Sequence, residues 1–220
     1  MASATSMFAQ EKDYKSLLLQ IDQVIEQSPE IVGQYERQIA EIRRQYLQAR
    51  QAEEKYDLAF SLYEHYKSFM NDSALYYLSE AEHWATRMGK TALAGKCLAL
   101  KAFQCSTVGY YNEALAFLKS IDKQQLDSIG LRHYYLSQMH VYGELGYYSI
   151  IPPMKEQYFK LQTTYRDSLF AHLDHQDPDY LMYRIQELKS RGQLAEARKV
   201  SDQWVSRTSP DSREYAIACY

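Results

Sequence analysis

The stretch GYYNEALAFLKSI, residues 109–121, places a small residue, Ala114, where the apolar face of a predicted helix begins. Its apolar neighbours in the stretch are mostly the larger residues Tyr, Leu and Phe. A short side chain lets the backbones of two packed helices approach closely, because their ridges and grooves can then interlock at short range. The stretch therefore predicts a helix that packs tightly against another helix.

The same arrangement recurs along the chain. Starting at a small residue, positions 0, 4 and 7 are Ala74, Leu78 and Ala81, then Ala114, Leu118 and Ile121, then Ala197, Ser201 and Trp204. Three glycines that we expect in turns, Gly109, Gly146 and Gly192, follow one another after 37 and 46 residues. Repeats of this length are typical of stacked helix pairs.

The composition supports a fold made of helices alone. The 220 residues include only 8 Gly and 5 Pro, which is few for an all-β protein, and no long run alternates Val, Ile and Thr with polar residues. We therefore predict an all-α superhelix of stacked antiparallel helix pairs. The expected helices in the repeats cover residues 91–107, 111–121, 129–144, 153–171, 179–190 and 194–207.

The N-terminal part predicts two further helices. The first covers Tyr14–Gln27, and Ser28 and Pro29 then form a favoured start for the second. The predicted organisation is a disordered leader or tag remnant over 1–13, a helical segment over 14–54, and repeats over 55–90, 91–128, 129–175 and 178–208, with a further repeat starting at 209–220.

These anchors resemble the second helix of tetratricopeptide (TPR) repeats, since Gly-Tyr-x-x-Glu-Ala precedes Leu118, and the resemblance covers residues 55–220. The order of LLLQIDQVIEQ, YERQIAEIRRQY, YKSFMNDSALYYLSEA and SPDSREYAIACY also resembles a Bacteroidetes family of membrane-anchored, TPR-containing regulators. That resemblance implies an extracytoplasmic TPR region followed by a transmembrane helix and a cytoplasmic regulatory end. We therefore expect a periplasmic location, with the cytoplasm as the alternative, and a chain that is a piece of a longer protein.

The sequence carries no motif for catalysis. It has no Gly-rich phosphate loop, no nucleophile elbow and no paired-carboxylate motif, so we expect no enzymatic activity and no cofactor. The net charge of −3 offers no basic field for direct nucleic-acid binding. The sequence contains no run of about 18 apolar residues, so we expect no membrane-spanning helix within it. The spacing of Cys97, Cys105 and Cys219 leaves their redox state open.

One loop, AHLDHQDPDY at residues 171–180, concentrates imidazole and carboxylate groups that could bind a divalent metal. Its candidate ligands are His172, Asp174, His175, Asp177 and Asp179. Asp177, however, precedes Pro178 at a predicted helix start, where it serves as the N-cap. We interpret the loop as solvated and expect no metal site.

The predicted binding surface is the concave face that the first helices of TPR pairs form together. Repeat register assigns ten residues to this face: Tyr56, Tyr63, Tyr66, Lys96, Phe103, His133, His140, Met182, Gln186 and Lys189. Aromatic, His and Lys side chains together suit a peptide segment of a partner protein. The alternative hypothesis is a ligand-binding module in which the Tyr-rich groove stacks against a glycan or peptide fragment.

The C-terminus gives one expectation about assembly. The sequence stops within a predicted helix, so the apolar face that contains Leu188 and Trp204 should be incompletely covered. Exposed apolar patches favour association. We therefore expect a possible dimer through this end.

Overall fold

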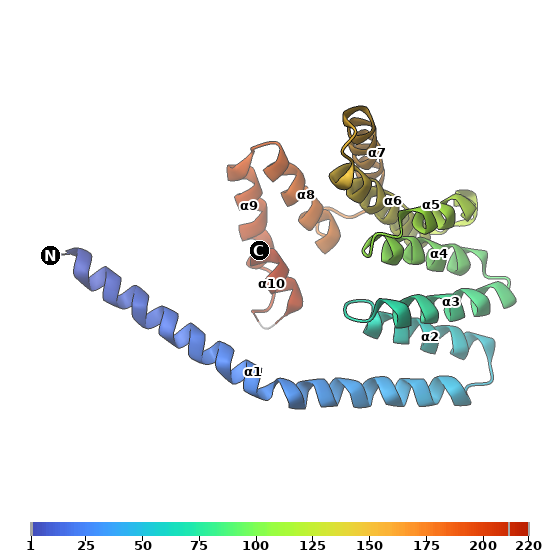
Figure 1. The fold of residues 1–220 in the computed structure, drawn as a ribbon, viewed down its shortest axis with the longest axis horizontal. Helices are drawn as coiled ribbons and strands as arrows, with labels where there is room; N and C mark the ends of the chain where they lie inside the picture. The colour runs from blue at the N-terminus through green and yellow to red at the C-terminus, as the bar shows by residue number, and fades with distance from the viewer. Residues whose placement is uncertain (1, 211, 220) are drawn as a thin grey trace. The chain divides into compact units, whose positions relative to one another are not determined.

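The computed structural model describes the backbone of residues 2–210 and 212–219, and the side chains from residue 14 onward except those of 17, 20, 211, 213 and 220. The chain divides into two compact units, residues 1–77 and 78–220. Its elements (Figure 1) are α1 Ala2–Gln48, α2 Ala52–Tyr66, α3 Asn71–Arg87, α4 Thr91–Ser106, α5 Tyr111–Ser120, η1 Lys123–Gln125, α6 Ser128–Tyr148, α7 Pro152–Phe170, α8 Pro178–Ser190, α9 Leu194–Val205 and α10 Arg213–Cys219. No strand occurs in this described part, and the predicted all-α class is confirmed.

The predicted helix end at Gln27 is wrong. Pro29 lies inside α1, which continues to Gln48 and bends part-way along its ribbon (Figure 1). Proline removes one backbone N–H and crowds the preceding turn, which kinks a helix without ending it when the flanking residues favour helix. The helix ends instead before a short connection over 49–51. The predicted leader over 1–13 lies outside the residues whose side chains are described, and the division into repeats stays a prediction.

The small residues of the recurring pattern are buried, as predicted. Ala74, Ala81 and Ala114 are fully buried, and Ala197 is 3% exposed. In the second unit, α4 packs against both α5 and α6. The approach of α4 and α6 is close enough for the Ser137 hydroxyl to donate a hydrogen bond to the Ala99 carbonyl oxygen at 2.7 Å.

Two of the three glycines predicted in turns adopt a conformation that requires glycine. Gly109 and Gly192 have φ angles of 86° and 73°, in the left-handed region that other residues rarely adopt. Gly146 is different, because it lies buried inside α6. A Cβ atom at this position would lie 2.8 Å from the Phe159 ring of α7. Gly146 thus allows two helices to approach, and its assignment to a turn was wrong.

The C-terminal apolar face is covered within the chain. Leu188 and Trp204 are 3% and 4% exposed, and they share a core cluster with Ala218 of α10. The Trp204 indole N–H donates a hydrogen bond of 2.7 Å to the Glu214 carboxylate, also on α10. The premise of our predicted dimer, an uncovered Leu188–Trp204 face, is therefore wrong.

Replacing Ala114 tests the helix packing. We expect Ala114→Leu to lower the free energy of unfolding by about 1–3 kcal/mol, because the added atoms have no space between close helices. Ala116 lies on the exposed side of the same helix, so Ala116→Leu is the matched control and should change stability by less than about 0.5 kcal/mol. Denaturant unfolding measures both. Equal stability of the two variants would contradict the packing of Ala114.

Candidate functional site

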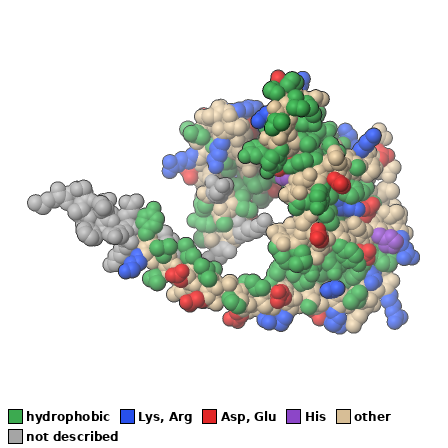
Figure 2. Space-filling model, viewed as in Figure 1, with side chains coloured by type: hydrophobic (Ala, Val, Ile, Leu, Met, Phe, Trp, Pro, Cys, Tyr) green, Lys and Arg blue, Asp and Glu red, His purple; other side chains and the backbone are tan. Residues whose placement is uncertain are grey.

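In the first unit, an apolar groove with a volume of about 1190 Å³ lies between α1 and the end of α2. We call it the N-terminal groove. Its lining consists of Ile31, Val32, Gln34, Tyr35, Glu36, Gln38, Ile39, Ala40, Arg43, Arg44, Leu47, Tyr66, Phe69 and Met70. Figure 2 shows hydrophobic side chains exposed along the described part of α1, with acidic side chains beside them. The groove is open to solvent, since Ile31, Val32 and Leu47 are 55%, 53% and 70% exposed.

The groove arises because α2 covers only part of the apolar stripe of α1. Ile39 and Tyr46 lie on this stripe and are buried, at 7% and 6% exposure, and α1 packs against α2. Towards the N-terminus the same stripe continues without this cover, as the exposure of Ile31 and Val32 shows. An apolar helix face that passes from buried to exposed has room for a further helix.

Tyr35 fixes the floor of the groove to α2. Its hydroxyl donates a hydrogen bond of 2.7 Å to the His65 carbonyl oxygen. Its ring makes edge contacts with the rings of His65 and Phe69, at centroid distances of 5.2 and 5.8 Å. An aromatic cluster therefore holds α1 against the C-terminal end of α2.

Charged groups form the rim of the groove, which is lined by Glu36, Arg43 and Arg44, and Glu41 pairs with Arg44 beside it. Arg44 donates hydrogen bonds to both carboxylate oxygens of Glu41, at 2.6 and 2.9 Å. These bonds from Arg44, with a further one from Gln45, lower the pKa of Glu41 to about 2. An apolar floor with an ionic rim is the usual composition of a protein–protein contact surface.

Two of the predicted binding residues in the first unit are packing residues. Tyr56 and Tyr63 are only 6% and 3% exposed, and both rings contact Phe60, at centroid distances of 6.0 and 5.5 Å. The prediction that these two residues lie on an open concave face is therefore wrong, because their large rings fill the contacts between helices. Tyr66 is half-buried, lines the N-terminal groove and stacks on Tyr77 at 5.6 Å.

The structure brings Phe103 and His140 together in the second unit. Their ring centroids are 4.4 Å apart, between α4 and α6. The His140 Nδ1 atom lies 2.8 Å from the Ser106 hydroxyl, and burial lowers the pKa of His140 below its usual 6.5, opposed by the charge of Glu144. Lys96 and His133 are half-buried on the same two helices. A binding role for these residues stays a prediction.

The three residues predicted from the last repeat also lie together. Met182, Gln186 and Lys189 of α8 line one hollow of about 240 Å³ with α9 and α10. Leu194 and Trp204 contribute to the same hollow. Its size limits it to a single side chain of a partner or a small fragment.

The family model of the SusR N-terminal TPR domain matches residues 25–220 of the chain. The chain belongs to this family. Comparisons with curated proteins and with solved structures give no match. The predicted resemblance to TPR-containing regulators is thereby confirmed.

Within this SusR-type TPR domain, the loop at residues 171–180, whose sequence resembled a metal site, caps the start of α8 and ties it to Arg132 of α6. Arg132 donates hydrogen bonds to Asp177 at 2.7 and 3.0 Å and to Asp179 at 2.6 Å. The Asp177 carboxylate also accepts from the Asp179 backbone N–H, which confirms it as the N-cap. No group of three or more possible metal ligands occurs among the described residues. Across the same part of the chain, no helix is long and apolar enough to cross a bilayer.

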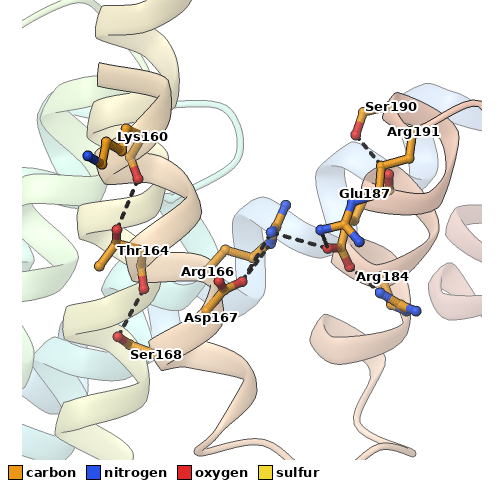
Figure 3. A network of polar contacts seen from close by, with 9 residues as sticks. All are labelled: Lys160, Thr164, Arg166, Asp167, Ser168, Arg184, Glu187, Ser190 and Arg191. Carbon is orange, nitrogen blue, oxygen red and sulfur yellow. Dashed lines mark hydrogen bonds and ion pairs between the residues drawn. The ribbon is translucent and has the colours of Figure 1, made fainter. Parts of the chain in front are cut away.

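A second polar network connects α7 to α8 (Figure 3). The Glu187 side chain is 5% exposed and lies against three guanidinium groups. Arg166 of α7 is 3.1 Å away, Arg191 is 2.7 Å away, and Arg184 also bonds it. The Arg166 Nη2 atom that contacts Glu187 also lies 3.0 Å from an Asp167 carboxylate oxygen. The buried Glu187 carboxylate therefore links α7, through Arg166, to the guanidinium groups of Arg184 in α8 and Arg191 at its C-terminal end.

Sequence reasoning missed the N-terminal groove, although the stripe Ile31, Tyr35, Ile39 and Tyr46 was visible in the sequence. The groove depends on where α2 ends relative to this stripe. Between Gly33 and Gly89 the chain has no Gly or Pro to mark a helix end. One signal could have revealed the groove: the apolar stripe of α1 is longer than α2, so α2 cannot cover all of it.

The titration of His140 makes stability depend on pH. The unfolded chain takes up a proton as the pH falls through about 6.5, whereas the folded domain resists this protonation, so stability falls below that pH by at most about 1.4 kcal/mol per pH unit. Thermal melts at pH 7.5 and 5.5 measure the loss. We expect a smaller loss for His140→Gln; an identical loss in both proteins would contradict the burial of a neutral imidazole.

Removing the buried carboxylate should weaken the α7–α8 connection. We expect Glu187→Gln to lower the free energy of unfolding by about 1–3 kcal/mol, because three guanidinium groups lose their shared counter-charge. Asp202→Asn is the control, since Asp202 is 71% exposed and lies 3.8 Å from Arg198, a surface pair worth about 0–1 kcal/mol. Denaturant unfolding of both variants measures the difference. A Glu187→Gln variant as stable as the control would contradict a stabilising role of the Glu187 carboxylate between α7 and α8.

Proposed function

We propose that this chain is the protein-interaction and sensing module of a larger SusR-like regulator, and that the N-terminal groove is its contact surface. The observation that carries the proposal is the open apolar groove on a domain of this family. The resemblance to membrane-anchored regulators supports a periplasmic position for the module. TPR domains are generally non-catalytic interaction modules, and the proposed role involves no chemistry.

The shape and composition of the groove support a protein segment as its occupant. The groove runs along a helix, its floor is mainly aliphatic, and charged side chains stand at its rim. An amphipathic helix with apolar residues three and four positions apart fits such a groove. A glycan would stack on exposed aromatic rings. Tyr56 and Tyr63 are buried, and of the aromatic residues that line the groove, Phe69 is 56% and Tyr35 is 37% exposed. The mainly aliphatic floor therefore favours a protein segment over a glycan.

Phe69 is the residue to replace in a test, because it lines the groove and is 56% exposed. In the full-length regulator, Phe69→Ala should lower the yield of photo-cross-linked partner about tenfold, as expected for one aromatic anchor. Its melting temperature should fall by only a few degrees, because the Phe69 side chain is 56% exposed although its ring contacts Tyr35 and Tyr66. Ile129→Ala is the control, since Ile129 is 57% exposed and lies in the other unit.

The regulatory output of the same strains gives the second readout. We expect Phe69→Ala to change the set of regulated transcripts as deletion of the domain does, and Ile129→Ala to leave it unchanged. A Phe69→Ala variant with full cross-linking and full output would contradict the proposed role of the groove.

A further inference from the structure

The apolar stripe of α1 extends beyond the N-terminal groove as a heptad repeat. From Tyr14 to Ala49, steps of four and three residues alternate without interruption through Tyr14, Leu18, Ile21, Ile25, Ser28, Val32, Tyr35, Ile39, Ile42, Tyr46 and Ala49. Ser28 is the one polar member. A sustained heptad of this kind is typical of a helix that packs along another helix.

The two halves of this stripe differ in their cover. Ile39 and Tyr46 are buried in the contact with α2. In the first half, Leu18, Ile21 and Ile25 are 60%, 54% and 61% exposed. Val24 and Ile31 are adjacent to these heptad positions on the same apolar face and are 60% and 55% exposed, so they widen it. The sequence over 14–35 therefore has the pattern of a packed helix. Among the described residues of its unit, however, no helix covers this stretch before Tyr35, which contacts α2.

We propose that a second copy of this chain covers the stripe, through antiparallel pairing of the two 14–35 segments about a two-fold axis. The inference rests on the proposed function, because the helix of the second copy enters the N-terminal groove. The pairing places Leu18 against the partner's Tyr35. It also places Ile21 against the partner's Val32, and Ile25 beside the partner's Ser28.

The apolar flank fits the same alignment. Val24 of one copy lies next to the partner's Ile31, and the contact repeats through the two-fold axis. Among the described side chains from Tyr14 to Tyr35, nine large apolar ones are exposed, and all of these except Leu19 belong to the stripe or its flank. Covering them removes several hundred Å² of apolar surface per copy, which approaches the roughly 800 Å² per partner of a standard stable interface.

Charge decides the direction of pairing. From 22 to 36 the helix carries the acids Asp22, Glu26, Glu30 and Glu36 and no basic residue. In parallel pairing, Glu36 would lie beside the partner's Ile31 and would gain no counter-charge. Antiparallel pairing instead places Lys15 opposite the partner's Glu36, because the two residues occupy equivalent heptad positions 21 residues apart. This ion pair forms twice in the dimer.

Sedimentation equilibrium of the 220-residue chain tests the pairing. We expect a reversible dimer, and Ile25→Glu should raise the dimer dissociation constant at least about tenfold by placing a charge in the seam. Gln27→Glu adds the same charge to α1 outside the stripe and should leave the dimer intact. A chain that stays monomeric at millimolar concentration, or a dimer that Ile25→Glu leaves unchanged, would overturn the proposal.

A charge exchange tests the direction. Lys15→Glu and Glu36→Lys should each weaken the dimer, and the double variant should restore it, because the pair is re-formed with its signs reversed. Weak association in the double variant would contradict antiparallel pairing.

The two proposals fail separately. Should the chain be monomeric while Phe69→Ala still loses partner cross-linking and regulatory output, another protein fills the groove, and only the dimer is wrong. Should Phe69→Ala keep both while the dimer forms, the groove has no part in regulation, and the proposed function is wrong.

Discussion

The close approach of helices to α4 is the constraint on which the second unit depends. Ala99 and Ala102 are fully buried on this helix, and α4 packs against both α5 and α6. The Ser137 hydroxyl bonds to a backbone carbonyl of α4 at 2.7 Å, which only short side chains between the helices allow. Larger residues would push the helices apart and remove this bond.

The same principle recurs at the other helix contacts of this unit. Ser201 of α9 donates a hydrogen bond of 2.7 Å to the Ala218 carbonyl oxygen of α10. Gly146 gives the Phe159 ring of α7 room against α6. Between α7 and α8 the contacts are ionic, through Arg166 and Glu187, and aromatic, through Phe170 and Tyr180, whose ring centroids are 4.7 Å apart. Small residues thus allow the close contacts of α4 with α6, α6 with α7 and α9 with α10, whereas an ion pair and an aromatic pair connect α7 to α8.

Local patterns in the sequence predicted much of this fold. Three predictions succeeded because each depends only on residues close together in the sequence. They are the buried alanines, the turns at Gly109 and Gly192, and the N-cap at Asp177. Gly146 failed, because turn and close-packing glycines look alike until the position of Phe159 is known. Pro29 failed because one proline cannot outweigh flanking residues that favour helix.

The candidate site was harder to predict than the fold. Repeat register predicts which side of a helix a residue lies on, but not whether another element covers that side. Tyr56 and Tyr63 were therefore assigned to an open face, although their rings fill helix contacts. Met182, Gln186 and Lys189 share a hollow because one helix face carries all three. The N-terminal groove needed the length of α2 compared with the stripe of α1, which depends on tertiary structure.

Hydrogen exchange of the backbone amides tests the central claim, that tightly packed small residues make α4 the most stable element of the second unit. Amides of elements with dense packing open only with the whole unit, and less packed elements open at lower free energy. The account predicts that amides of Ala99, Ala102 and their neighbours in α4 exchange most slowly, and that amides of α7 exchange faster. Exchange in α4 as fast as in α7 would contradict it.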